Sequence, residues 1–139
     1  MKISLIATTA ILALTSPVFA GDAAKGENEF KKCKACHEIV ADDGTAIVKG
    51  GKTGPNLYGV VGRAAGTVEG FSYSDVMKEA GEKGLVWDEE TLVKYLPDPS
   101  AFLEETSGDS AGKSKMTFKL KKGGDDVAAY LASVVPAAN

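Results

Sequence analysis

The five residues Cys33-Lys34-Ala35-Cys36-His37 constrain this chain more than any other stretch. The C-x-x-C-H pattern is the attachment signature of a c-type haem. Two thiols one helical turn apart can form thioethers with the two vinyl groups of one porphyrin. The imidazole that follows can then bind the iron as its proximal ligand. The motif therefore predicts that Cys33 and Cys36 carry a haem and that His37 ligates it.

Two other chemistries also use paired cysteines. A thioredoxin-like dithiol expects a βαβ setting, and no convincing strand precedes Cys33. A structural zinc ion needs four protein ligands, whereas the chain has two cysteines and one histidine. Carboxylates would have to complete such a site, so the sequence favours haem over both alternatives.

The N-terminal stretch has the pattern of a secretory signal peptide. Lys2 supplies the positive start, residues 3–14 are an apolar run, and Val18-Phe19-Ala20 is a small-residue cleavage site. The run is too short to span a bilayer core of about 30 Å. We therefore expect residues 1–20 to be removed. Residues 21–139 would then form one small soluble domain in the oxidising periplasm, with both cysteines in thioethers and no disulfide.

Charge is distributed unevenly along the chain. Lys2 is the one charged residue before position 21, so the mature part carries 15 basic and 19 acidic side chains. Acids dominate residues 69–109, whereas residues 113–122 hold five lysines and no acid. Such asymmetry can make a dipolar surface that steers a charged partner. A merely solvated charge run is the alternative interpretation.

Hydrophobic spacing predicts an all-α domain made of short helices. The expected helices run from Asp22 to about residue 37, over residues 74–80, after Asp88, after Asp98 with Pro99 in first position, and from Gly124 or Asp125 onward. Gly26 stands inside the first, where glycine costs up to about 1 kcal/mol, so we expect a close helix crossing there. Residues 39–57 and 104–115 lack a sustained period and are predicted to be loops.

Two methionines compete for the distal side of the iron. The chain has a single histidine, so a second imidazole ligand is excluded, and Met77 and Met116 remain after removal of the signal peptide. Met77 lies in a short helical segment, where a methionine is more often core filler. Met116 follows a polar loop that could deliver it to the ring, so we favour Met116. A histidine–methionine pair raises the reduction potential and suits electron transfer.

Taken together, these segments resemble the class I cytochromes c, most closely the bacterial cytochrome c2 branch. The matches follow the family's order along nearly all of the mature chain: Gly26-x-x-x-Phe30, Cys33 to His37, residues 52–59, Gly62-Arg63, Tyr73-Ser74, Trp87, Tyr95-Leu96-x-x-Pro99, Lys115-Met116-x-Phe118 and the segment around Tyr130. The resemblance implies a small fold of short helices and long loops wrapped around one covalent haem c. It also implies that Gly26 and Phe30 cross the last helix at Tyr130 and Leu131.

The resemblance further implies roles for residues around the haem. Pro55 would accept a hydrogen bond from His37 and so orient the proximal ligand. Tyr95 would sit beside the sulfur of Met116, and Phe118 would close the exposed haem edge. Three residues would bond or neutralise the haem propionates: Arg63, Tyr73 and Trp87.

The chain departs from mitochondrial relatives near the expected pocket. Residues 104–113 intervene before the ligand segment, where those relatives have a short approach, and Asp42-Asp43-Gly44 lies in an expanded loop. Ser114 stands where they have threonine, and Met77 where they have asparagine. None of these departures removes a ligand, but Met77 changes the expected polarity of the pocket.

The function expected from the resemblance is that of a one-electron carrier, not an enzyme. Its partners would be a membrane cytochrome bc complex as donor and a photosynthetic reaction centre or terminal oxidase as acceptor. A monomer is expected, without a nucleic acid partner, docking through a lysine-rich face at the haem edge: Lys115, Lys119, Lys121 and Lys122, completed by Lys32, Lys34 and Lys52. The rivals, a haem peroxidase or oxygen-binding protein and a gas sensor, need an exchangeable sixth ligand.

Overall fold

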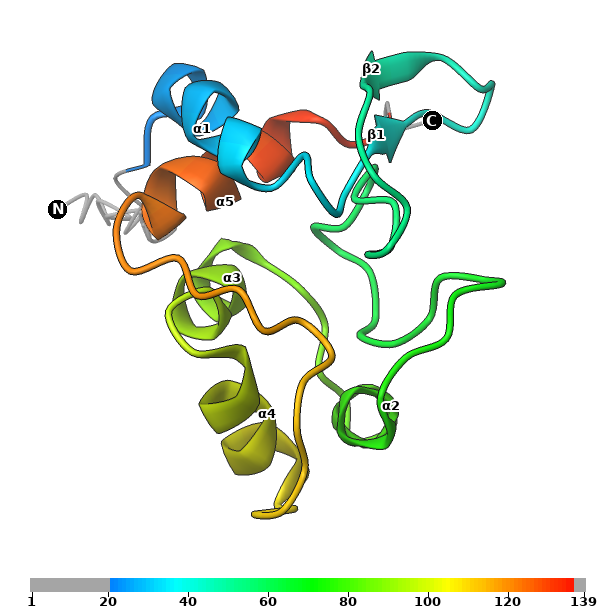
Figure 1. Ribbon diagram of the computed structural model, residues 1–139, viewed down its shortest axis with the longest axis vertical. Helices are drawn as coiled ribbons and strands as arrows, with labels where there is room; N and C mark the ends of the chain where they lie inside the picture. Colours follow the sequence, from blue (N-terminus) through cyan, green and yellow to red (C-terminus); the bar gives the residue numbers. More distant parts are fainter. Residues whose placement is uncertain (1–20, 137–139) are drawn as a thin grey trace, which may run out of the picture.

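The computed structural model describes residues 21–136, so the predicted signal peptide lies outside the described residues. Short helices joined by long loops make up most of this part of the chain (Figure 1). In chain order the elements are α1 (Ala23–Glu29), η1 (Phe30–Lys32), β1 (Ile39–Val40), β2 (Ala46–Val48), α2 (Asp75–Glu82), α3 (Glu89–Tyr95), α4 (Pro99–Ser107) and α5 (Gly124–Ser133). The predicted all-α class is confirmed, with one small hairpin added.

Aspartates fix where three of the helices begin. The side chains of Asp22 and Asp98 accept hydrogen bonds from first-turn amides of α1 and α4. Asp88 forms a capping box with Thr91 at the start of α3. Pro99 occupies the first turn of α4, where its missing N–H costs nothing. These caps satisfy amides that have no partner within the helix, and the three predicted starts are confirmed.

The first helix ends earlier than the sequence predicted. α1 stops at Glu29, and Phe30–Lys32 form a single 3₁₀ turn. The motif follows as consecutive turns, in which the His37 amide donates to the Cys33 carbonyl over 2.9 Å. Tight turns are usual at helix ends, and this one bends the chain so that the motif lies beyond the helix rather than inside it.

α1 crosses α5 at a glycine (Figure 1). A Cβ atom at position 26 would overlap the backbone carbonyl of Asp126, so a side chain there would separate the two helices. Beyond this contact the rings of Phe30 and Tyr130 pack with their centroids 5.6 Å apart, and Leu131 is 3% exposed. The predicted close crossing is confirmed.

The loop predicted after the motif contains a hairpin. β1 and β2 pair antiparallel, with Ile39 opposite Val48, and the turn between them places Gly44 at a φ of 86°. The Gly44 amide donates to the Ala41 carbonyl and the Ala41 amide to the Thr45 carbonyl, both over 2.9 Å. Asp42-Asp43-Gly44 therefore form a three-residue hairpin loop with its glycine in the left-handed conformation, a common connection between paired strands. The prediction of a loop is wrong over β1 and β2, because the turn brings the residues on either side of it together and they pair as strands.

Two helices are longer than predicted. α2 continues through Gly81 to Glu82, and a Cβ at Gly81 would overlap the carbonyl of Ala65. This glycine therefore permits a close approach instead of ending the helix. α4 continues to Ser107 and ends at Gly108, whose φ of 78° makes a left-handed cap. The predicted polar loop accordingly begins at residue 108.

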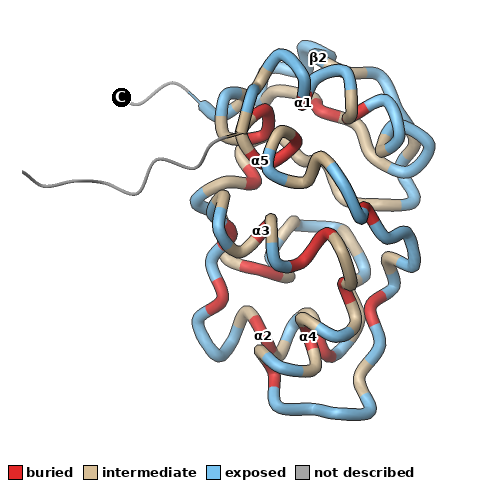
Figure 2. Tube along the Cα trace, turned by 90° about the vertical axis from the view of Figure 1, so that its left-hand side faces the viewer, coloured by how far each residue is buried: buried red, intermediate tan, exposed pale blue. Residues whose placement is uncertain are grey.

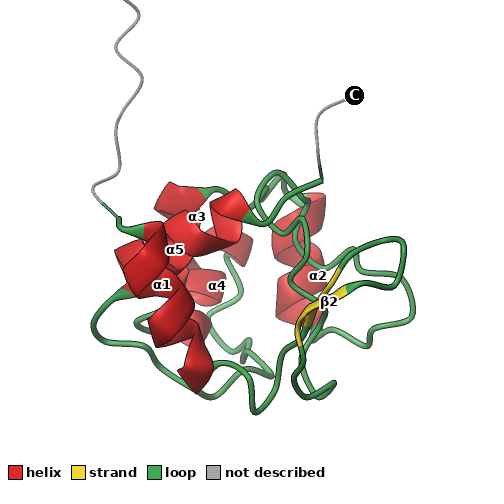
Figure 3. Ribbon diagram, turned by 90° about the horizontal axis from the view of Figure 1, so that it is seen from above, coloured by secondary structure: helices red, strands yellow, loops and turns green. Residues whose placement is uncertain are grey.

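The helices form two groups around the interior. Seen from above, α1, α3, α4 and α5 gather on one side, and α2 and the hairpin lie on the other (Figure 3). Each helix carries both buried and more exposed positions (Figure 2). No helix within residues 21–136 is both long and apolar enough to cross a membrane.

Candidate functional site

A cavity of about 360 Å³ opens between these groups, within the size range of ligand pockets. Its lining runs from Phe30 to Leu131, comes from η1, α2, α3, α5 and the loops between the elements, and consists mostly of apolar side chains. All ten residues predicted for the site line it: Cys33, Cys36, His37, Pro55, Arg63, Tyr73, Trp87, Tyr95, Met116 and Phe118. Residues up to 85 positions apart in the chain thus meet in one place.

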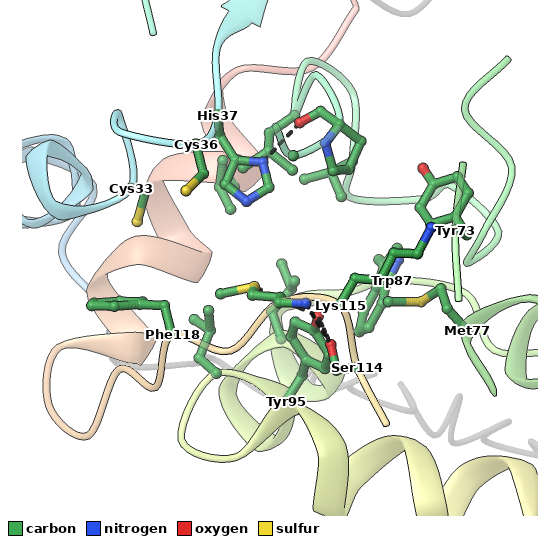
Figure 4. A pocket seen from close by; sticks show the side chains of 18 of the residues that line it. Cys33, Cys36, His37, Tyr73, Met77, Trp87, Tyr95, Ser114, Lys115 and Phe118 are labelled. Carbon is green, nitrogen blue, oxygen red and sulfur yellow. Dashed lines mark hydrogen bonds between the residues drawn. The ribbon is translucent and has the colours of Figure 1, made fainter. Parts of the chain in front are cut away.

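The cysteine motif forms one wall of the cavity, where the side chains of Cys33, Cys36 and His37 lie in a row (Figure 4). Cys33 is half-buried and Cys36 is exposed. Burial raises the pKa of the Cys33 thiol to about 11, against the opposing effect of nearby Lys32. A dithiol redox site needs a thiol of depressed pKa, so this environment argues against the thioredoxin-like alternative.

The zinc alternative lacks ligands in the described residues. No group of three or more His, Cys, Asp or Glu side chains within residues 21–136 could hold a metal ion. A structural zinc site needs four such ligands.

The His37 ring is fixed by two neighbours in the chain segment opposite. Its Nδ1 lies 2.8 Å from the carbonyl oxygen of Pro55 and donates to it, which leaves Nε2 directed into the cavity (Figure 4). A Cβ atom at Gly54 would overlap the imidazole ring, so glycine lets the backbone lie flat against it. Burial lowers the pKa of His37, and the bond to Pro55 opposes this. The ring is therefore neutral, as metal ligation requires.

Asn56 holds the Pro55 segment in place, a role that the sequence analysis missed. Its Oδ1 accepts from the amide of Val40 over 3.0 Å, and its Nδ2 donates to the Val40 carbonyl over 2.8 Å. The side chain thus pairs with the backbone of β1 as another strand would. An asparagine directly after Gly54-Pro55 was the available signal, but its partner lies 16 residues away.

Met116 lies against the opposite wall, beside a small polar network. The Tyr95 hydroxyl donates to the Met116 sulfur over 3.6 Å and lies 3.5 Å from the Ser114 hydroxyl. Ser114 also accepts from the Met116 amide over 3.1 Å. Burial raises the pKa of Tyr95, so its phenol stays a neutral donor. Ser114 was noted only as a departure from relatives, yet it lines the cavity and touches both neighbours.

Met77 lines the same cavity, at the end marked by Tyr73 and Trp87 (Figure 4). It is half-buried on α2 and packs against the core. Of the two methionines, Met116 is the one whose sulfur receives a hydrogen bond.

A cation stands at the Tyr73 end of the cavity. Arg63 Nη1 donates to the carbonyls of Asn56 and Tyr58 over 3.2 and 3.3 Å. No carboxylate pairs with it among residues 21–136. Burial lowers the pKa of Arg63, but a guanidinium remains charged in proteins. This end of the cavity therefore suits an anionic group.

Arg63 and Trp87 are placed together by the backbone. The Trp87 amide donates to the Arg63 carbonyl over 2.9 Å, and Gly62 donates to the Trp87 carbonyl over 2.7 Å. Trp87 is 6% exposed, and its ring packs edge-on against Tyr95 at 4.9 Å. The Tyr73 hydroxyl accepts from the amide of Val68 over 3.3 Å, and burial raises the pKa of Tyr73.

Phe118 lies at the other end of the cavity, close to Cys33, with 43% of its surface exposed (Figure 4). Several of the lysines predicted to surround this end pair with acids. Lys119 pairs with Asp98 at 2.7 Å, so one residue of the acidic stretch 69–109 lies beside the lysine-rich segment. Lys32 pairs with Glu29, and Lys52 approaches Glu38 at 4.0 Å. Of the lysines predicted to form the docking face, four have no ion pair among residues 21–136: Lys34, Lys115, Lys121 and Lys122. Lys115 does not lie at the Phe118 end, because its Nζ donates to the carbonyl of Ser72, next to Tyr73 in the chain.

The donor set of the cavity fits a covalently held haem. It combines two thiols and a neutral imidazole on one wall, a thioether on the other, and a cation at one end in an otherwise apolar lining. Histidine and methionine are established axial ligands of haem iron, and the unpaired guanidinium fits a propionate.

Comparison with known proteins gives close relatives over almost the whole chain. The chain is 62% identical over 136 residues to cytochrome c2 of Rhodobacter capsulatus, covering 97% of this chain and 99% of that protein. It is 59% identical over 140 residues to cytochrome c-550 of Paracoccus versutus, covering 98% and 91%. The solved structure of the Rhodobacter cytochrome c2 matches with a TM-score of 0.81 and covers 82% of this chain and 98% of its own. No protein-family model matches the chain.

Proposed function

The chain belongs to the class I c-type cytochromes, close to cytochrome c2, and from this membership we propose that it shuttles single electrons between membrane complexes in the periplasm. Proteins of this family are electron carriers rather than enzymes, and they hold one covalent haem c. This chain is therefore an electron carrier with one haem c. The proposal adds the residues, the compartment and the partners.

We assign thioether attachment to Cys33 and Cys36, proximal ligation to His37 and distal ligation to Met116. The observation that carries this assignment is that His37 and Met116 line one cavity from facing walls, each with a hydrogen bond that directs its ligating atom. The predicted contacts to Pro55 and Tyr95 supply these two bonds. Arg63, Tyr73 and Trp87 would face the propionates, and Phe118 would cover the exposed edge.

When bound, the haem supplies the one-electron redox centre. The chain contributes its ligands and their surroundings. Pro55 holds the His37 imidazole in one tautomer and orientation. The neutral thioether of Met116 favours the reduced state, as methionine ligation generally does. His37 and Met116 would both ligate the iron, which would leave no exchangeable site for a peroxidase or a gas sensor.

The proposed path runs from a membrane cytochrome bc complex to a photosynthetic reaction centre or a terminal oxidase. Removal of residues 1–20 would release a soluble monomer into the periplasm, in keeping with the signal-like pattern of that stretch. Docking would use the exposed end of the cavity at Phe118, together with the exposed lysines that follow it in the chain, Lys121 and Lys122.

The proposal is tested with protein expressed in a bacterium that attaches haem c. Acid–acetone extraction should leave the pigment on the protein. The ferric form should show the weak thioether-to-iron absorption band, and the reduced form should not change with carbon monoxide. N-terminal sequencing of the periplasmic fraction should begin at Gly21. Extractable haem, or a spectrum that responds to carbon monoxide, would contradict the assignment.

A further inference from the structure

Residues 108–115, which we call the approach segment, join the end of α4 to Met116. They include most of the stretch that distinguishes this chain from mitochondrial relatives. The segment does not hang loose. Between Gly112 and Lys115 each residue has a partner elsewhere in the fold, on α2, on α4 or just before α2: Val76, Glu104, Ser100 and Ser72 respectively.

Gly112 packs against α2 at a point that leaves no room for a side chain. A Cβ atom built on Gly112 would lie 2.6 Å from Val76 Cγ2 and 2.7 Å from Val76 Cβ. Val76 is 2% exposed, and a β-branched side chain in a helix has one strongly preferred rotamer. The valine cannot turn away, so residue 112 must lack a side chain for this packing to exist. Gly112 is not among the positive-φ glycines, so contact and not backbone conformation requires the glycine.

The polar contacts of the segment are weaker restraints. Lys113 pairs with Glu104, and Lys115 Nζ donates to the Ser72 carbonyl over 2.7 Å, both at exposed positions. Exposed pairs of this kind contribute little to stability. The Ser114 amide donates to Ser100 Oγ over 3.0 Å at a part-buried position. The packing on Val76 is thus the contact that a single methyl group would disrupt.

We propose that Gly112 is a positioning residue for Met116: its packing on Val76 holds the approach segment against α2 and so resists displacement of the thioether. The inference rests on the proposed function, because it requires Met116 to be the distal ligand. Only three residues separate the two positions, so Met116 cannot leave the cavity without drawing the segment away from α2. The contact between Gly112 and Val76 exists only while the segment lies against α2, so it favours the arrangement with Met116 in the cavity over the one with Met116 withdrawn.

The test measures how tightly imidazole, a competing ligand for ferric iron, binds to the holoprotein. Gly112→Ala strains only the arrangement in which the segment lies against α2. It should therefore bind imidazole about tenfold more tightly, the factor expected when overpacking costs about 1.4 kcal/mol. Adding Val76→Ala makes room for the new methyl group, so the double variant should return close to the wild-type affinity.

Gly124→Ala is the matched control. Its Cβ would meet Leu96 at 3.6 Å, an ordinary van der Waals distance, and imidazole affinity should not change. If Gly112→Ala does not yield folded protein, Val76→Ala alone tests the same contact without adding an atom, and should bind imidazole about threefold more tightly. The proposal is overturned if the single variant that folds binds imidazole with wild-type affinity. It is also overturned if the double variant binds imidazole as tightly as Gly112→Ala does.

Failure of this inference is distinguishable from failure of the proposed function. If Met116 is not the ligand, the wild-type ferric protein lacks the thioether-to-iron band, whatever the variants do. If Met116 is the ligand but Gly112 does not position it, the band is present and the imidazole affinities of all variants agree.

Discussion

A single hydrogen bond orients each of the two proposed ligands, His37 and Met116. The Pro55 carbonyl accepts a hydrogen bond from His37 Nδ1, and the Tyr95 hydroxyl donates one to the sulfur of Met116. Each bond is local to one wall of the cavity, so the two walls can be tested separately. A change on the Met116 side should alter the distal ligand without loosening the imidazole.

The distal assignment is tested by exchanging the two methionines separately. Met116→Ala removes the thioether that Tyr95 contacts, so the thioether-to-iron band should disappear. The reduced protein should then bind carbon monoxide, and the reduction potential should fall by on the order of 0.1 V. Met77→Leu keeps an apolar side chain of similar volume on α2 and should do none of these. Spectra and redox titration measure both variants, and the reverse pattern would move the ligand to α2.

The principal residues of the site were predictable because the chain offers few alternatives. One histidine, two cysteines and two methionines beyond residue 20 leave little choice of ligand. Gly54, Asn56 and Ser114 were not assigned roles, although they fit against the His37 ring, β1 and Tyr95. Their partners lie 16 to 19 residues away, and a single sequence does not show which distant groups meet.

At the scale of elements, the crossing of α1 and α5 depends on one missing side chain. Gly26→Ala would push a methyl group into the Asp126 carbonyl, which belongs to rigid helix backbone. We expect the free energy of unfolding to fall by about 3 kcal/mol, the upper range for overpacking, with haem still attached. Denaturant titration of the holoprotein measures this. Gly124→Ala, at the start of the other helix of the pair, should change stability little, and equal losses would contradict the crossing argument.

Helix starts were predictable where helix ends and the hairpin were not. An aspartate cap acts on amides two or three residues away, so Asp22, Asp88 and Asp98 could be identified locally. The end of α1 and the extent of α2 instead depend on what packs against them. Gly81 illustrates this. From the sequence alone a glycine at this position is expected to end α2, but the helix continues because Gly81 packs against the backbone of Ala65.

At the scale of the whole molecule, residues 21–139 are net acidic, whereas the proposed docking face consists of lysines. Lys121 and Lys122 are exposed and have no ion pair within residues 21–136, whereas Asp98 neutralises Lys119. The positive field of the proposed face is therefore weaker than the count of its lysines suggests. This field depends chiefly on the lysines without an ion pair, so Lys121 and Lys122 are the positions at which the charge should be reversed.

Electron transfer to an isolated membrane partner should slow as ionic strength rises, because salt screens the attraction that steers encounter. Lys121→Glu with Lys122→Glu should slow the bimolecular rate roughly tenfold at low salt and flatten its salt dependence. The matched control reverses Lys78 and Lys94, which pair with Asp75 and Glu90 on α2 and α3. Both double variants change the net charge equally, so net charge alone predicts equal losses. Stopped-flow rates over a range of salt decide between them: a loss confined to the Lys121 and Lys122 variant supports docking at the cavity rim. Equal losses, or a wild-type rate insensitive to salt, would leave these lysines as ordinary solvated surface.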